Sequence, residues 1–136
     1  MTKEKKISII ISTYNKEKFI KNTIKSCLNQ SYKNYEIIVV DTGSTDKTKK
    51  IIKKFKKKKV ITIYLKKKYN TGPINQIYSI KNGLKKSNGE IICLLDGDDI
   101  FVKNKLKEIN KYFNRNKGSC FVQDVAKVVK NKKKFD

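Results

Sequence analysis

Three carboxylates follow one short apolar segment of the chain. The segment Ile91–Leu95 holds five apolar residues in a row and leads directly into Asp96, Gly97, Asp98 and Asp99. Such a segment predicts a short strand that is buried on both faces and presents the carboxylates together at its end. Three negative charges within four residues repel one another, and a hard cation such as Mg²⁺ or Mn²⁺ would relieve that repulsion. Gly97 would let the backbone turn so that Asp96 and Asp98 point to one place, although a solvated acidic turn explains the segment alone equally well.

Polar residues also end two other strand-like segments, at 6–12 and 36–40. The residues at these two ends are Ser12, Thr13, Tyr14, Asn15 and Asp41. An aromatic ring beside small hydroxyl groups, such as Tyr14, can stack on a nucleobase, and Asp41 can accept a hydrogen bond from a ring N–H or a ribose hydroxyl. A metal at the acidic turn can bridge a diphosphate and neutralise the charge that develops as it leaves. The three groups together describe a site for a nucleoside diphosphate whose β-phosphate is a leaving group.

Each polar group alone has an ordinary structural explanation. Tyr14 could pack at the rim of the sheet, and Asp41 could cap the turn at 43–46. Ser44 or Thr45 is expected to cap the helix that follows that turn. Only the conjunction of the groups at three strand ends favours a binding site.

Strand-like and helix-like segments alternate four times along the chain. The expected strands are 6–12, 36–40, 60–65 and 91–95. The first expected helix is 16–30, with Asn15 as its N-cap, and the second carries Ile51, Ile52 and Phe55 inward. The third runs from Pro73 to about 86, with an apolar stripe of Ile74, Ile77, Ile80 or Lys81, and Leu84. The fourth lies near 103–116, with Leu106, Ile109, Tyr112 and Phe113 inward. Residues 119–122 and 126–129 are weaker strand candidates. This alternation predicts an α/β fold with a parallel sheet, helices on both faces and ligands at the carboxyl ends of its strands.

The composition indicates one basic domain. The chain has 136 residues and a formal charge of +22, and Arg115 is the only arginine among its 34 basic residues. Such an excess favours anionic partners: nucleotide phosphates, an acidic membrane surface or, without specificity, nucleic acid. Proteins that read nucleic-acid sequence rely on arginine for bidentate contacts, so no specific nucleic-acid partner is expected.

The three cysteines and the absence of targeting signals point to a reducing compartment. Cys27, Cys93 and Cys120 show no CxxC spacing, and two of them lie in apolar runs, which is typical of buried free thiols. The charged N-terminus does not resemble a signal peptide, and no apolar run approaches the length of a membrane span. The chain is therefore expected in the cytoplasm, at most peripheral to the inner face of the membrane.

Three segments of the sequence, 9–15, 29–46 and 89–99, closely resemble family 2 glycosyltransferases in their order and spacing. The likeness runs from about Ile7 to Asn116. It implies a GT-A fold, Rossmann-like with a mostly parallel sheet. It also implies the transfer of a sugar from a nucleotide-sugar, most often a UDP-sugar, with inversion at the anomeric carbon and with Mn²⁺ or Mg²⁺ as cofactor.

The resemblance also implies roles for single residues. Ser12 and Tyr14 match the pair that contacts uracil, and Asp41 matches the first acid after the second strand. Thr42 stands where the family often has an Asp that accepts the uracil N3–H, so that another base is also compatible with the site. The implied nucleotide-sugar site comprises Ser12, Thr13, Tyr14, Asn15, Asp41, Thr42, Lys81, Asp96 and Gly97. Asp96, Asp98 and Asp99 form the implied metal site, and Lys81 lies in a helix that often supplies a basic group to the diphosphate.

The family likeness implies a single donor-binding domain over residues 1–136, apparently truncated after the donor-binding half. Its core would span about 6–117, and 118–136 would start an incomplete C-terminal part. Family members usually continue into an acceptor half that supplies the general base, so this base is expected outside the chain, and Asp124 comes too early to serve. The acceptor would be an unknown glycan, lipid-linked molecule or protein. The alternatives are a truncated, non-catalytic nucleotide-sugar-binding remnant and, more weakly, a basic nucleic-acid-binding module.

Overall fold

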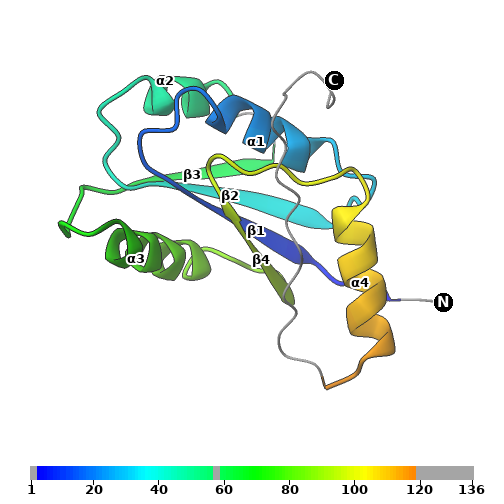
Figure 1. The fold of residues 1–136 in the computed structure, drawn as a ribbon. Coiled ribbons are helices and arrows are strands. Elements are labelled where there is room, and N and C mark those ends of the chain that lie inside the picture. The colour runs from blue at the N-terminus through cyan, green and yellow to red at the C-terminus, as the bar shows by residue number, and fades with distance from the viewer. Residues whose placement is uncertain (1–2, 57–58, 119–136) are drawn as a thin grey trace.

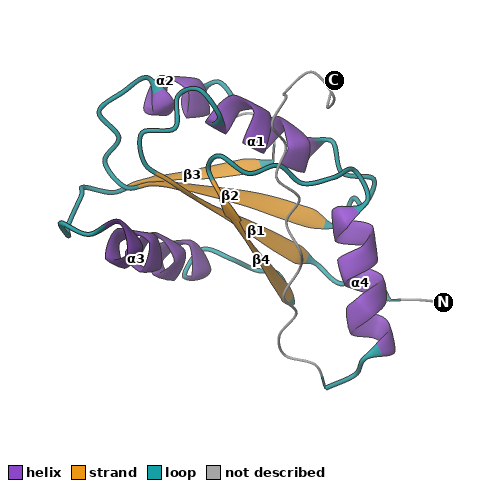
Figure 2. Ribbon diagram, viewed as in Figure 1, coloured by secondary structure: helices purple, strands orange, loops and turns teal. Residues whose placement is uncertain are grey.

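The computed structural model describes residues 3–56 and 59–118, which form one parallel sheet with helices on both faces (Figures 1 and 2). The strands of this part of the chain are β1 (Ile7–Thr13), β2 (Tyr35–Asp41), β3 (Val60–Tyr64) and β4 (Ile91–Asp96). The helices are α1 (Ile20–Leu28), α2 (Thr48–Lys53), α3 (Gly72–Leu84) and α4 (Lys105–Arg115). The strands lie in the order β3-β2-β1-β4, and each neighbouring pair is parallel. The predicted α/β class is therefore confirmed.

The two faces of the sheet have separate cores. Residues of α1, α2 and α4, among them Ile24, Ile52 and Leu106, join alternate strand residues in the larger core. On the opposite face, Ile10, Ile38 and Val40 form a smaller cluster that α3 covers in part. The central strands β1 and β2 are buried on both faces, as their continuous apolar sequences predicted.

The strand β4 is not buried on both faces, so this part of the sequence prediction is wrong. It pairs with β1 on one side and lies at the edge of the described sheet. Its side chains alternate between buried and exposed, and Leu94 is 54% exposed. The register aligns Leu94 with Ile10, so Leu94 points to the face that carries α3. An apolar run predicts a strand here, but the sequence alone does not show that α3 leaves this border uncovered.

The predicted inward stripe of α3 is also wrong. The buried residues of this helix are Asn75, Ser79 and Gly83, whereas Ile77 is 66% exposed, and Ile74 and Leu84 are exposed as well. The helix approaches the sheet closely on its small side chains, since a Cβ on Gly83 would lie 2.6 Å from the Ile10 Cγ2 atom. Close approach through small residues therefore overrides the hydrophobic periodicity.

The other helix predictions need smaller corrections. The helix α1 begins at Ile20 rather than at Lys16, and Phe19 is its N-cap residue. In α4, Leu106 is buried as expected, but Tyr112 is 41% exposed and does not face inward. The weaker strand candidates at 119–122 and 126–129 lie outside the described residues.

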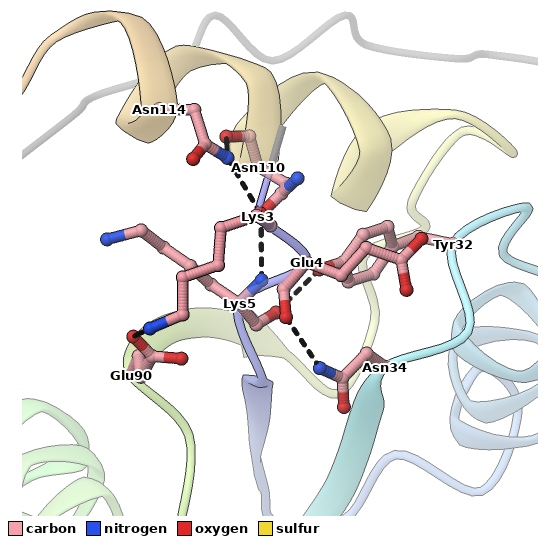
Figure 3. Close-up of polar contacts among 8 residues, drawn as sticks. All are labelled: Lys3, Glu4, Lys5, Tyr32, Asn34, Glu90, Asn110 and Asn114. Carbon is pink, nitrogen blue, oxygen red and sulfur yellow. Dashed lines mark hydrogen bonds and ion pairs between the residues drawn. The ribbon is translucent and has the colours of Figure 1, made fainter. Parts of the chain in front are cut away.

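The segment that precedes β1 is held at the far end of the sheet from the predicted site (Figure 3). Asn110 and Asn114 of α4 bind the backbone of this segment: Asn110 Oδ1 accepts from the Lys5 N–H at 3.1 Å, and Asn114 Nδ2 donates to the Lys3 carbonyl at 2.9 Å. The Tyr32 hydroxyl donates to the Lys5 carbonyl at 2.6 Å. Polar side chains thus fix α4 against the start of β1, which explains why Asn110 is buried.

Glu36 joins three segments at the same end of the sheet. Its Oε1 accepts hydrogen bonds from the Ser8 hydroxyl and the Asn88 N–H, both at 2.6 Å, and its Oε2 lies 2.8 Å from the Lys6 ammonium. Burial alone would raise the pKa of Glu36, but the hydrogen bonds from Lys6, Ser8 and Asn88 together outweigh it and lower that pKa.

Glu36→Gln is expected to destabilise the fold by about 1.5–3 kcal/mol at pH 7, because hydrogen bonds to a charged group are lost. Since the pKa of Glu36 is lower in the folded state, its contribution is present above the ordinary value of 4.5 and is lost as the pH falls through the folded value. Urea unfolding at pH 7 and near pH 3 measures both effects, and the two proteins should converge at the lower pH. Glu108→Gln is the control, because Glu108 is exposed and its carboxylate pairs, among the described residues, with Lys111 of its own helix. It should change stability by less than about 0.5 kcal/mol, and an equal loss in both variants would contradict the role of Glu36.

The two described cysteines are buried free thiols, as predicted. Burial raises the pKa of Cys27 to about 12 and that of Cys93 to about 11, so both thiols stay protonated and unreactive at neutral pH. Among the described helices, none is long and apolar enough to cross a membrane.

Candidate functional site

The sheet register brings the three polar strand ends to one edge. Ser12 of β1 pairs with Asp96 of β4, and Thr13 pairs with Asp41 of β2. The loops after these strands therefore leave the sheet side by side, as the alternation of elements predicted. The first turn of α3 lies at the same edge, because α3 runs back along the sheet from Gly72 (Figure 1).

A cleft of about 410 Å³ opens at this edge. Its lining residues are Ser12, Thr13, Tyr14, Lys16, Thr42, Lys67, Asn70, Gly72, Asn75, Gln76, Asp96, Gly97 and Asp98. The structure therefore brings together seven of the residues that the sequence singled out. Asn15, Asp41, Lys81 and Asp99 do not line the cleft.

Asn15 holds the loop after β1 to the loop after β2. Its backbone has φ 50°, and its Oδ1 accepts a hydrogen bond from the Thr45 N–H at 2.8 Å, while its own N–H donates to the Ser44 hydroxyl at 2.9 Å. The N–H of Lys16 donates to the Thr48 hydroxyl at 2.8 Å. The predictions that Asn15, Ser44 and Thr45 are helix N-caps are therefore wrong, because these residues bind the neighbouring loop instead. The cross-links fix the cleft wall that carries Tyr14.

Asp41 lies behind the cleft wall and has no exposed surface. Its Oδ1 accepts hydrogen bonds from the N–H groups of Gly43 at 3.1 Å and Ser44 at 3.0 Å, so the carboxylate closes the turn after β2. Gly43 has φ 87°, a conformation that favours glycine. Thr42, which does line the cleft, donates its hydroxyl proton to the Thr13 carbonyl at 3.3 Å.

Gly97 is required for space rather than for an unusual turn. Its N–H donates to the Ser12 carbonyl at 2.9 Å, and its carbonyl accepts from the Thr23 hydroxyl at 3.0 Å. A Cβ at this position would lie 2.5 Å from Thr13 Oγ1. The absence of a side chain therefore lets the acidic turn press against β1, which places Asp96 and Asp98 at the cleft.

Each of the two carboxylates in the cleft already has a partner. Asp96 Oδ1 accepts a hydrogen bond from Gln76 Nε2 at 2.5 Å, and Asp98 Oδ2 lies 2.6 Å from the Lys16 ammonium. Burial and the negative charges of Asp98 and Asp96 raise the pKa of Asp99, and the positive charge of Lys16 lowers it by a smaller amount. The three carboxylates thus repel one another as expected, and Lys16 supplies part of the compensation.

The donor set suits a shared metal site rather than a closed protein cage. No group of three Asp, Glu, His or Cys side chains that could hold a metal occurs in the part of the chain that the structure describes. Asp96 and Asp98 are two carboxylates that face one cleft. This number fits Mg²⁺ or Mn²⁺, since such ions are usually held by one or two carboxylates together with substrate phosphates and water.

Sequence reasoning missed the basic and amide groups of the cleft. The Lys67 ammonium lies 5.2 Å from the centroid of the Tyr14 ring, within the range of a cation–π interaction. Lys16, Lys67 and Gln76 are ordinary residue types in a lysine-rich sequence, and their positions carry no pattern. Lys81, by contrast, is exposed in the last turn of α3, away from the helix start that lines the cleft.

Open parallel α/β sheets, among them those of nucleotide-binding proteins, bind their ligands in a crevice at the carboxyl ends of the strands, and the polar cleft of this sheet lies there. The family model for glycosyl transferase family 2 matches residues 8–135, so the chain belongs to this family. The neighbouring solved structures are GT-A glycosyltransferases, which confirms the predicted fold type.

Individual relatives agree with this assignment. The chain is 41% identical over 115 residues to an uncharacterized glycosyltransferase of Rickettsia bellii, covering 84% of this chain and 16% of the relative. It is 32% identical over 123 residues to the GalNAc(5)-diNAcBac-PP-undecaprenol beta-1,3-glucosyltransferase of Campylobacter jejuni, covering 87% and 39%. The crystal structure of S. aureus TarS 1-349 in complex with UDP-GlcNAc superposes with a TM-score of 0.68 at 27% identity, covering 87% and 37%. The chain thus spans less than half the length of these proteins.

Proposed function

We propose that this chain is the donor-binding part of a glycosyltransferase that takes a nucleoside diphosphate sugar, with a UDP-sugar as the first candidate. The observation that carries the proposal is that Tyr14, Asp96 and Asp98, from the ends of neighbouring strands, line the same cleft. The TarS complex with UDP-GlcNAc supports a uridine donor. The proposal includes inversion at the anomeric carbon, which the resemblance to family 2 glycosyltransferases implies.

The cleft residues suit the parts of such a donor. The Tyr14 ring, 37% exposed, offers a face on which a base can stack. Thr42 is 2% exposed but lines the cleft, and because its hydroxyl proton is donated to Thr13, a base that reaches this oxygen can donate an N–H to its lone pairs. Uracil and guanine both present such an N–H, whereas the corresponding ring nitrogens of cytosine and adenine are acceptors. Uridine and guanosine diphosphates are therefore the candidates to compare.

The diphosphate would lie between the acidic turn and the basic groups of the cleft. Asp96 and Asp98 would hold Mg²⁺ or Mn²⁺, which when bound supplies positive charge to the leaving β-phosphate. Lys16 and Lys67 line the same cleft and add positive charge. Asn15 and Asp41 support the site from behind, because each holds a loop that carries a lining residue.

We extend the proposal to a lipid-linked acceptor at the cytoplasmic face of a membrane. The Campylobacter jejuni relative is named for an undecaprenol-linked glycan. The charge of +22 on this chain favours a peripheral position on an anionic bilayer. Co-sedimentation with anionic and with neutral vesicles tests this position, and equal binding to both would contradict it.

Calorimetric titration of the chain with UDP, GDP and their sugars, with and without Mn²⁺, tests the donor proposal. We expect at least one of them to bind with a dissociation constant between about 1 μM and 1 mM, more tightly when Mn²⁺ is present. CDP and ADP are the matched ligands for the Thr42 argument and should bind more weakly. The absence of binding by every uridine and guanosine nucleotide, with and without the metal, would contradict the proposal.

A further inference from the structure

Lys16 binds one oxygen of the Asp98 carboxylate, which is one of the two that the divalent cation would use. Its ammonium lies 2.6 Å from Asp98 Oδ2, and both side chains line the cleft and are partly exposed. An ammonium and a metal ion cannot both bind this oxygen in the same direction at such distances. Cation binding at Asp98 Oδ2 therefore requires Lys16 to leave this oxygen.

The backbone of Lys16 stays fixed while its side chain is able to move. Its N–H donates to the Thr48 hydroxyl at 2.8 Å, and its carbonyl accepts from the N–H groups of Phe19 and Ile20, both at 2.9 Å. The ammonium itself ends a flexible four-carbon stem. The side chain can consequently exchange one anion in the cleft for another without a change in the loop.

The partner of the second carboxylate differs in charge. Asp96 is bound by the neutral Gln76 amide, whereas Asp98 pairs with the Lys16 ammonium. The competition between protein and metal is therefore concentrated at one oxygen, and a single substitution removes it.

We propose that Lys16 is a resident counter-ion of Asp98 that couples the binding of a divalent cation to the binding of the nucleoside diphosphate. In the absence of a nucleotide, a metal ion has to displace the ammonium, which then loses its anionic partner. When a diphosphate is bound, its oxygens accept the ammonium, and Asp98 becomes free for the metal. Metal and nucleotide then strengthen each other's binding by the same factor. This inference rests on the proposed function, since the second anion is the donor's diphosphate.

The test compares Lys16→Met with Lys18→Met. Methionine retains much of the apolar stem and removes the charge, and Lys18 is an exposed lysine two positions away that does not line the cleft, so its variant has the same net charge. Electron paramagnetic resonance of free Mn²⁺ measures the Mn²⁺ affinity of each protein alone and with saturating UDP. Circular dichroism checks that each variant is folded, and Lys16→Gln replaces Lys16→Met if the latter does not fold.

Lys16→Met should bind Mn²⁺ alone about tenfold more tightly than the unaltered chain, and the gain in Mn²⁺ affinity on adding UDP should shrink by a similar factor. Lys18→Met should behave like the unaltered chain. If UDP binds but Lys16→Met and the unaltered chain have the same Mn²⁺ affinity without UDP, the inference is overturned. The same holds if neither protein binds Mn²⁺ measurably without UDP. If UDP and GDP bind to none of the proteins under any condition, the proposed function fails instead, and the inference fails with it.

Discussion

Asp98→Asn is expected to remove most of the UDP affinity that Mn²⁺ adds, a loss on the order of 100-fold at saturating Mn²⁺. Asparagine keeps the shape of the side chain but offers a neutral, weaker ligand to a hard cation. The substitution also releases Lys16, whose ammonium is 2.6 Å from Asp98 Oδ2 and would become available to the diphosphate. UDP affinity without metal should therefore stay the same or increase slightly. Calorimetric titration with UDP in Mn²⁺ and in EDTA separates the two effects.

Asp99→Asn is the matched control for that experiment. It makes the same chemical change one position further along the turn, but Asp99 does not line the cleft. We expect it to weaken UDP binding in Mn²⁺ by less than about fivefold, because it alters only the charge around the site. Equal losses in the two variants would show that the net negative charge of the turn, rather than a ligand at Asp98, holds the metal. A loss confined to Asp99→Asn would contradict the arrangement proposed for the site.

Gly97→Ala is expected to damage stability and nucleotide binding together. The added Cβ would lie 2.5 Å from Thr13 Oγ1 and 2.7 Å from Thr13 Cβ, and Thr13 is almost fully buried. Neither atom is the end of a flexible chain, so the acidic turn has to move away from β1. Overpacking of this kind costs about 1–3 kcal/mol. The movement also displaces Asp96 and Asp98, and metal-dependent UDP affinity should fall at least about tenfold.

Gly72→Ala provides the comparison for stability. A Cβ on Gly72 meets no atom within 4 Å, so the same added methyl group should change the free energy of unfolding by less than about 0.5 kcal/mol. Urea unfolding of both variants measures the difference. If Gly97→Ala is as stable as the unaltered chain, the close contact between the acidic turn and β1 does not restrict this position.

Much of the fold could be predicted because its signals are local. The apolar runs of β1 and β2 and the turn residues after them define central strands without knowledge of their neighbours. Hydrophobic periodicity failed in α3, where Gly83 rather than Ile77 faces the sheet. The depth of a helix against a sheet depends on side chains from both partners, here Gly83 and Ile10, which are far apart in the sequence. The exposure of one face of β4 has the same origin, because it depends on how much of the sheet α3 covers.

The candidate site was predictable only where side-chain types carry chemistry by themselves. Three Asp residues at a strand end indicate a cation, and the register then places Asp96 next to Ser12 as the topology requires. Lys16 and Lys67 could not be distinguished from the other lysines, since their roles come from the folding of loops that are separate in sequence. Asp41 illustrates the opposite case, in which a residue with suitable chemistry is buried in the turn that it closes.

Among the described strands, β4 has one unpaired border, and this border and the cleft are two different places at which the fold can be extended. New main chain can pair along this border, which runs the length of the strand, whereas the cleft opens across the strand ends. Additions at the border therefore leave the cleft intact. On the proposed function, different acceptor-binding segments can therefore be joined to the same nucleotide-binding unit, in evolution or by design, without a change in the residues that hold the nucleotide.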